Sequence, residues 1–185
     1  MPEVLLYACC APCAIVPLAR LRERFSVQVF FFAPNIHPAG EYRRRRDEVA
    51  RLCREEGVEF SEGPYRPAEW GRAVRPYRHL PEGSERCQAC FRLRLGEAAR
   101  RARQLGFAAF AATLSVARQK NSRLVNQIGH ACAELAGVRF VDDDWKKGGG
   151  ADLAVARSRE RGFYRQNYCG CALSRSERIR KESAA

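Results

Sequence analysis

The segment VLLYACCAPC, residues 4–13, is a short apolar run followed directly by closely spaced cysteines. The apolar run predicts a buried strand at 4–8, and the spacing of the next apolar residues predicts a helix at 14–24. A strand that leads at once into a helix is typical of a β–α–β unit. We therefore expect the cysteines to lie at the carboxyl end of the first strand.

The same alternation of strand and helix continues along the chain. Further strands are predicted at the apolar stretches 27–32, 58–60, 107–114 and 138–141. Helices are predicted at 41–56, 67–75, 90–104, 122–135 and 152–161. These lengths indicate right-handed β–α–β units and one α/β domain over 1–185, with a parallel sheet covered by helices. Ligands of such sheets bind beyond the carboxyl ends of the strands. Disorder is expected only in the charged C-terminal tail.

The chain is strongly basic, with 33 Lys and Arg against 21 Asp and Glu and a formal net charge of +12. Arginine supplies most of this charge, and its planar guanidinium pairs bidentately with phosphate. A polyanion such as RNA is therefore a plausible partner in charge terms. An arginine-rich surface that only reflects genome composition is the alternative.

Membrane insertion and secretion are not expected from this sequence. The longest apolar run is only a few residues, far short of the roughly 20 that a spanning helix needs. The N-terminus carries Glu3 and no basic region before its short apolar stretch, unlike a signal peptide. We expect a cytoplasmic protein with no membrane partner.

Nine cysteines in a cytoplasmic chain require an explanation, because the reducing cytosol disfavours structural disulfides. Cys53 and Cys132 fall on the apolar stripes of predicted helices, so we expect them to pack in the core. The other seven do not follow a core stripe. They form three groups in predicted loops or at the ends of elements: Cys9, Cys10 and Cys13; Cys87 and Cys90; Cys169 and Cys171.

Clustered cysteines of this kind indicate metal binding or catalysis. Four of them could hold a [4Fe–4S] cluster, and the remaining three could hold a second metal with a vacant position. Alternatively, Cys169 and Cys171 form a redox-active disulfide pair. Zinc stays open, although the two C-x-x-C pairs lie too far apart in the chain for a compact zinc ribbon.

Six stretches, taken in order, resemble the epoxyqueuosine reductase QueH family. They are ACCAPC at 8–13, PNIHPAGEYRRR at 34–45, GSERCQACFRLRL at 83–95, AATLSVARQKN at 111–121, DDDWKKGGG at 142–150 and YRQNYCGCALS at 164–174. The resemblance implies an oxidoreductase that performs the last step of queuosine biosynthesis. Its partner would be tRNA carrying epoxyqueuosine at the anticodon wobble position, and its electron donor is unassigned. The fold implied is Rossmann-like, similar to adenine-nucleotide hydrolases. The cofactors implied are a [4Fe–4S] cluster and a nearby mononuclear iron, without cobalamin.

The resemblance also implies roles for individual residues. The metal ligands would be Cys9, Cys10, Cys13, Cys87, Cys90, Cys169 and Cys171. We expect Cys9, Cys10, Cys87 and Cys90 to bind the cluster, with the adjacent pair split or shared between the two metals, and Cys13 to bind the second iron. The candidate proton donors are Tyr168, His37 and Asp144 of the acidic group 142–144. Their structural alternatives are packing for Tyr168, loop bracing for His37, and capping or ion pairing for Asp144.

RNA contacts are expected from the arginines of two predicted helices, at 43–46 and at positions 92, 94, 100, 101 and 103. Tyr42, Tyr164 and Tyr168 are candidates for stacking on bases.

Two other functions fit parts of the sequence. A tRNA-thiolating enzyme also joins a Rossmann-like fold to an iron–sulfur cluster, but it needs a glycine-rich phosphate loop after the first strand, where this chain has CCAPCA. A zinc-stabilised RNA-binding module would explain the charge and both C-x-x-C pairs. It would leave Cys9, Cys169 and Cys171 without a role.

Overall fold

The structure is a computed structural model that describes residues 1–183. Its centre is a parallel sheet with the strand order β3-β2-β1-β4-β5. The strands are β1 (Glu3–Ala8), β2 (Ser26–Phe31), β3 (Glu59–Glu62), β4 (Ala109–Ala112) and β5 (Arg139–Phe140). This arrangement confirms the predicted parallel α/β fold.

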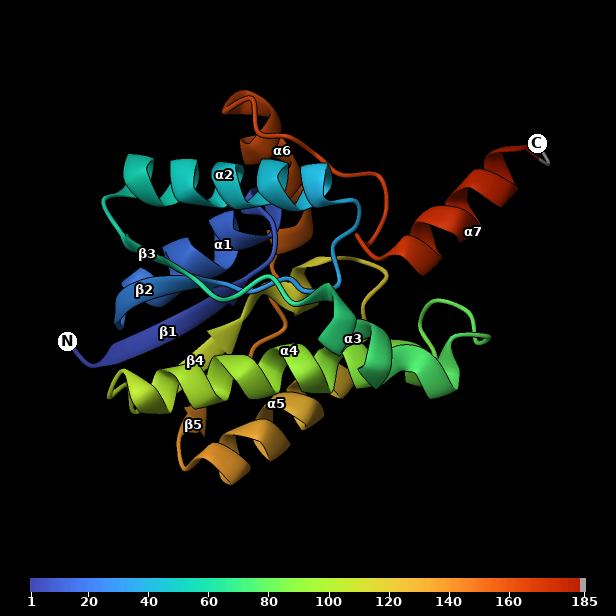
Figure 1. The fold of residues 1–185 in the computed structure, drawn as a ribbon. Helices are drawn as coiled ribbons and strands as arrows, with labels where there is room; N and C mark the ends of the chain where they lie inside the picture. The colour runs from blue at the N-terminus through green and yellow to red at the C-terminus, as the bar shows by residue number, and fades with distance from the viewer. Residues whose placement is uncertain (184–185) are drawn as a thin grey trace.

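Helices cover both faces of the sheet. Figure 1 shows α1, α2 and α6 on one face, α3, α4 and α5 on the other, and α7 projecting from the body. The helices are α1 (Ala11–Arg22), α2 (Ala39–Glu56), α3 (Pro67–Val74), α4 (Glu85–Gln104), α5 (Ser122–Ala136), α6 (Gly150–Glu160) and α7 (Ala172–Ser183). Two 3-10 segments, η1 (Arg75–Tyr77) and η2 (Thr113–Val116), complete the elements. No helix in the described part of the chain is long and apolar enough to span a membrane.

Several predicted boundaries are wrong, among them that of the first helix, which begins at Ala11 rather than at residue 14. The fourth helix begins at Glu85 rather than at residue 90, so Cys87 and Cys90 lie within its first turns. The strand predicted at 107–114 is confined to β4, and its last residues turn into η2. The expected disordered tail forms α7 as far as Ser183, and the two residues beyond it lie outside the described chain.

The central strand β1 is fully buried from Val4 to Ala8, which explains its unbroken apolar sequence. The parallel pairing of β1 with β2 and β4 determines which residues meet at the carboxyl edge of the sheet. Tyr7 pairs with Phe30 of β2 and with Ala112 of β4. The residues that follow β1 and β4, namely Cys9 and Thr113, therefore emerge at the same carboxyl edge of the sheet.

Helix α5 packs so closely on the sheet that one of its positions has no room for a methyl group. A Cβ built on Gly129 would stand 2.5 Å from the ring of Phe140, which is buried in β5. We expect Gly129→Ala to lower the free energy of unfolding by about 1–3 kcal/mol, because overpacking forces the ring and helix apart. Urea unfolding measures the effect.

The matched control is Gly96→Ala in the interior of α4, where the nearest atom to a new Cβ is the sulfur of Cys132 at 3.9 Å. This substitution is expected to stabilise the fold by about 0.5–1 kcal/mol, since alanine favours a helix over glycine. Equal effects at the two positions would contradict the packing described here.

Candidate active site at the carboxyl end of the sheet

The cysteines after β1 line a small cavity of about 170 Å³ at the carboxyl edge of the sheet. Cys10 is the extended residue before α1, and Cys13 lies in the first turn of that helix. The segment before α7 reaches the same cavity from the other end of the chain. The sulfur-bearing residues that line it are Cys9, Cys10, Cys13 and Cys169.

The remaining three cysteines of the predicted set lie in the same region. Cys169 also lines an adjoining cavity of about 350 Å³, where it is joined by Cys87 of α4. Cys90 and Cys171 pack together with Trp70 and Val74 in a small apolar cluster beside these cavities. The structure thus brings all seven cysteines to one region.

The two cysteines assigned to the core lie elsewhere and are buried as expected. Cys53 is 1% exposed on α2, and burial raises the pKa of its thiol to about 12. Cys132 lies on α5 with its sulfur 3.8 Å from the carbonyl oxygen of Arg92. All nine cysteines are free thiols, so the structure does not join Cys169 to Cys171.

Five of the clustered sulfurs accept hydrogen bonds from nitrogen donors, among them Cys13, which accepts from Gln166 Nε2 at 4.0 Å. Lys120 Nζ lies 3.2 Å from the sulfur of Cys169, and Arg94 Nη1 lies 3.7 Å from that of Cys90. Backbone N–H groups donate to the other two sulfurs, from Gly83 to Cys87 at 3.2 Å and from Ser174 to Cys171 at 3.3 Å. Such donors stabilise thiolates and tune the potentials of iron–sulfur clusters.

Arg94 is a buried cation, 2% exposed, that makes no ion pair with a carboxylate anywhere in residues 1–183. Its Nε donates to the hydroxyl of Tyr7 at 2.6 Å. Burial alone would lower the pKa of Arg94, but the facing Tyr7, Cys9 and Cys90 groups raise it well above its ordinary value. A buried guanidinium without a carboxylate requires another source of negative charge nearby.

The Cys9 and Cys10 thiols, which follow β1, are neutral at ordinary pH because both pKa values are raised. The neighbouring Cys10 thiol, together with burial, raises the pKa of Cys9 well above its ordinary value. The Cys13 thiol and burial raise the pKa of Cys10 to about 12. No three Cys, His, Asp or Glu side chains among the residues described surround one point as metal ligands. The seven sulfurs therefore lie in one region of the structure, but they do not converge on a single point.

A family model described as Epoxyqueuosine reductase QueH matches residues 4–177, almost the whole chain. The chain belongs to the QueH family. A Thermotoga maritima protein of that name is 37% identical over 186 residues, which cover 99% of this chain and 95% of the relative. A Streptococcus pyogenes QueH protein is 36% identical over 94% of this chain and 70% of its own length.

A solved structure with the same fold is described as a predicted subunit of a tRNA methyltransferase from Methanocaldococcus jannaschii. It covers 89% of this chain and 93% of its own, with a TM-score of 0.56. The sequence identity is only 9%, so this similarity supports the α/β fold of the QueH chain and nothing further.

The predicted proton donors of this QueH chain are not brought together. Tyr168 lines the cysteine cavity, and its hydroxyl donates to the carbonyl oxygen of His37 at 2.5 Å. His37 itself does not line the cavity, and its ring packs against Trp70 with 5.4 Å between centroids. Asp144 accepts a hydrogen bond from Ser122 at the start of α5, outside both cysteine-lined cavities. Of the three, only Tyr168 is placed beside the sulfurs.

Three residues predicted to contact RNA in this QueH chain are buried instead, so those predictions are wrong. Arg94 belongs to the cysteine region described above. Arg45 is 1% exposed and donates to Glu41 at 2.7 Å and to the carbonyls of Tyr168 and Cys169 at 3.3 and 3.1 Å. Tyr42 is 4% exposed, with its hydroxyl 2.6 Å from Glu62. Arg45 thereby fixes the Cys169 segment onto α2.

Sequence reasoning gave no role to Thr113, Lys120 or Gln166, which all line the cysteine cavity of the QueH chain. The Thr113 hydroxyl is fully buried and finds no hydrogen-bond partner within residues 1–183. A polar residue directly after a buried strand was the available signal for Thr113. No local sequence pattern indicates Lys120 or Gln166, because each lies in a loop whose position depends on contacts with distant parts of the chain.

Proposed function

We propose that this chain reduces epoxyqueuosine in tRNA to queuosine in the cytoplasm, the activity for which its relatives are named. We further propose that it uses a [4Fe–4S] cluster and a separate iron, and that it needs no cobalamin. The observation that carries the proposal is a region of seven thiols that also contains the buried Arg94, whose guanidinium pairs with no carboxylate in residues 1–183.

The seven cysteine thiols are suitable ligands for iron and for an iron–sulfur cluster. Thiolates are the ligands that iron–sulfur clusters take in proteins. We assign Cys9, Cys10, Cys87 and Cys90 to the cluster and Cys13 to the second iron, with Cys169 and Cys171 completing the set. A cluster held by four thiolates is negatively charged, which matches the cationic side chains of Arg94 and Lys120 beside the sulfurs. Because burial and the neighbouring thiols raise the pKa values of Cys9 and Cys10, metal binding must displace the protons of these two thiols.

Conversion of an epoxide to an alkene consumes two electrons and two protons and releases the oxygen as water. Bound cofactors would supply the electrons, received from an external donor, and Lewis acidity toward the epoxide oxygen. The protons must come from groups beside the sulfurs. Tyr168 and Thr113 are the hydroxyl side chains that line the cysteine cavity. Burial raises the pKa of Tyr168, so its hydroxyl keeps its proton at neutral pH until it donates.

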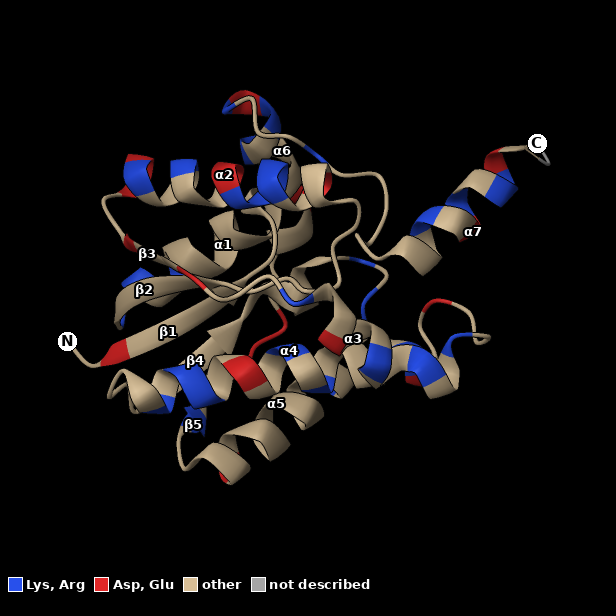
Figure 2. Ribbon diagram, viewed as in Figure 1, with Lys and Arg blue, Asp and Glu red and all other residues tan. Residues whose placement is uncertain are grey.

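Basic residues occur on two helices near the same end of the sheet. Figure 2 shows Lys and Arg, interspersed with Asp and Glu, on α2, whose start lies toward the carboxyl edge, and on α7, which projects beyond that edge. Arg43 and Arg44 are exposed near the start of α2, and the Arg44 guanidinium lies 3.5 Å from the ring centroid of Tyr164. We assign these arginines to tRNA phosphates, whose contacts position an RNA without reading its sequence.

The proposal is tested by purifying the protein without oxygen and measuring iron, zinc and acid-labile sulfide per chain. About four sulfides with more than four irons would support a cluster and a separate iron. The loaded protein is then given tRNA containing epoxyqueuosine and a chemical reductant, with and without added cobalamin. Zinc without sulfide would overturn the redox function and favour a zinc-stabilised RNA-binding module.

Thr113→Val tests whether the Thr113 hydroxyl, one of the two in the cavity, takes part in proton delivery. Valine has nearly the shape of threonine but no hydroxyl, so the maximal rate of reduction is expected to fall by about 10²-fold while the iron content stays unchanged. Thr113→Ser should restore most of the rate. If the hydroxyl had no role, valine would be at least as stable in this buried position and equally active.

A further inference from the structure

A second pocket adjoins the cysteine cavity on the side of α6. It measures about 220 Å³ and lies between the first turn of α1, the end of η2, α6 and the loop at 165–166. We call it the α1–α6 pocket. Cys13, Ala117, Gln119 and Gln166 line both this pocket and the cysteine cavity, so the two spaces adjoin.

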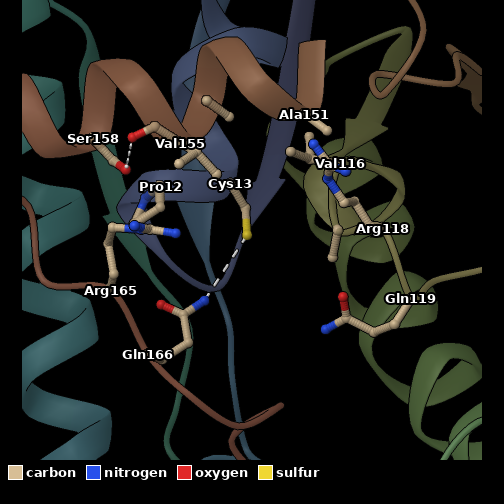
Figure 3. Close-up of a pocket in the computed structure, with 12 residues that line it drawn as sticks. Pro12, Cys13, Val116, Arg118, Gln119, Ala151, Val155, Ser158, Arg165 and Gln166 are labelled. Carbon is tan, nitrogen blue, oxygen red and sulfur yellow. Dashed lines mark hydrogen bonds between the residues drawn. The ribbon is translucent and has the colours of Figure 1, made fainter. Parts of the chain in front are cut away.

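The lining of the α1–α6 pocket combines apolar walls with two amide side chains. Its apolar walls are formed by Pro12, Val116, Ala151, Ala154 and Val155. Figure 3 shows Gln166 and Gln119 on opposite sides of the space below the sulfur of Cys13. Gln166 Nε2 lies 4.0 Å from that sulfur. Apolar faces with amide groups at the edge suit a flat ring that carries hydrogen-bonding groups on its rim.

A buried hydrogen-bonding atom of the pocket has no partner within residues 1–183. This atom is Gln166 Oε1. A buried acceptor without a donor is costly, so such an atom points to a ligand that supplies an N–H group. Arg118 and Arg165 also line the pocket and are exposed, which places positive charge at its rim.

We propose that the α1–α6 pocket binds the 7-deazaguanine base of the modified wobble nucleotide, with Gln166 Oε1 accepting an N–H of that base. The assignment rests on the proposed function, because the epoxide-bearing ring of epoxyqueuosine hangs from this base on a short arm. A base held beside Cys13 places that arm toward the cysteine cavity. The pocket is smaller than the roughly 300–1,000 Å³ of sites for whole drug-sized ligands, as expected for one base splayed out of an RNA loop.

The test compares two anticodon stem–loop RNAs, one with queuosine at the wobble position and one abasic there. Their dissociation constants for the iron-loaded protein are measured by fluorescence anisotropy without oxygen. The wild type is expected to bind the queuosine RNA about ten-fold more tightly than the abasic RNA, the contribution of a good base contact. Gln166→Ala should bring this ratio close to one while leaving the affinity for the abasic RNA unchanged.

A second pair of variants tests the pocket independently of Gln166, in case Gln166→Ala misfolds. Ala151→Trp fills the pocket from α6, whereas Leu153→Trp adds the same side chain to the same helix at an exposed position outside the pocket. Only Ala151→Trp should abolish the preference for the queuosine RNA. All variants must keep the iron content and circular dichroism spectrum of the wild type.

The RNA-binding measurement tests the base pocket, and the turnover measurement tests the reductase function, so the two proposals can fail separately. A wild-type ratio of one, or a ten-fold preference that survives both Gln166→Ala and Ala151→Trp, overturns the base pocket even if the enzyme reduces its substrate. A protein that distinguishes the two RNAs through Gln166 but never reduces epoxyqueuosine overturns the proposed function and leaves the base pocket standing.

Discussion

Replacing Cys10 with alanine is expected to leave the protein without stable iron and to reduce its epoxyqueuosine reductase activity by more than about 100-fold. Loss of a partner that merely orients a metal ligand already costs 10–100-fold. Cys10 is 1% exposed, so water cannot readily take the place of its sulfur. Iron and sulfide analysis of protein purified without oxygen, followed by the tRNA assay, measures both effects.

Cys53→Ala is the matched control for this experiment. Cys53 is equally buried, at 1% exposure, but it packs between α2 and the sheet, away from the cysteine cavities. Its replacement should lower the stability of the fold and leave the iron content and the rate per iron unchanged. A Cys10→Ala protein that kept its iron, or a Cys53→Ala protein that lost it, would refute the division between metal-binding and core cysteines.

Removing the buried charge of Arg94 is expected to have opposite effects on the metal-free and the iron-loaded protein. Arg94→Met alone would leave the Tyr7 hydroxyl without its partner, so the informative variant is Tyr7→Phe/Arg94→Met. Without metal, this apolar pair should be as stable as the wild type or more stable by about 1–4 kcal/mol, because the desolvated cation is gone. Urea unfolding of chelator-treated protein measures this difference.

With iron bound, the same variant should lose its cluster faster and show a lower reduction potential. Reduction adds negative charge to the cluster, and a neighbouring guanidinium stabilises that charge, so its removal disfavours the reduced state. Arg92→Met, an exposed position two residues away on α4, serves as the control and should alter neither property. Unchanged iron retention in Tyr7→Phe/Arg94→Met would mean that Arg94 does not balance the charge of a cluster.

Much of the fold could be predicted because its signals are local. Apolar runs marked the buried strands, and the helical spacing of apolar residues separated Cys53 and Cys132 from the other seven cysteines. The start of α4 was misplaced because a C-x-x-C pair fits the first turns of a helix as well as a loop. Cys87 and Cys90 are three residues apart and therefore lie on one helical face.

The electrostatic partners of the site were harder to predict because burial cannot be read from an arginine-rich helix. Arg94 stands among exposed arginines on α4, and Arg45 stands beside exposed ones on α2. The spacing of four residues that links Glu41 to Arg45, and Cys90 to Arg94, was the available local signal. The contacts of Arg45 with Tyr168 and Cys169 span more than a hundred positions, and no local pattern encodes them.

Cysteines from both ends of the sequence meet in the site, so metal binding there would also affect how well the protein resists proteolysis. Gln166 and Cys13, which meet beside the sulfurs, are 153 positions apart in the chain. A metal bound between these segments acts as a cross-link that closes a very long loop, the case in which loop closure stabilises a fold most. A molecule that lost the proposed iron to oxygen would therefore lose this cross-link together with its activity. We expect proteases to attack its C-terminal segment first, so that damaged enzyme is removed while loaded enzyme is spared.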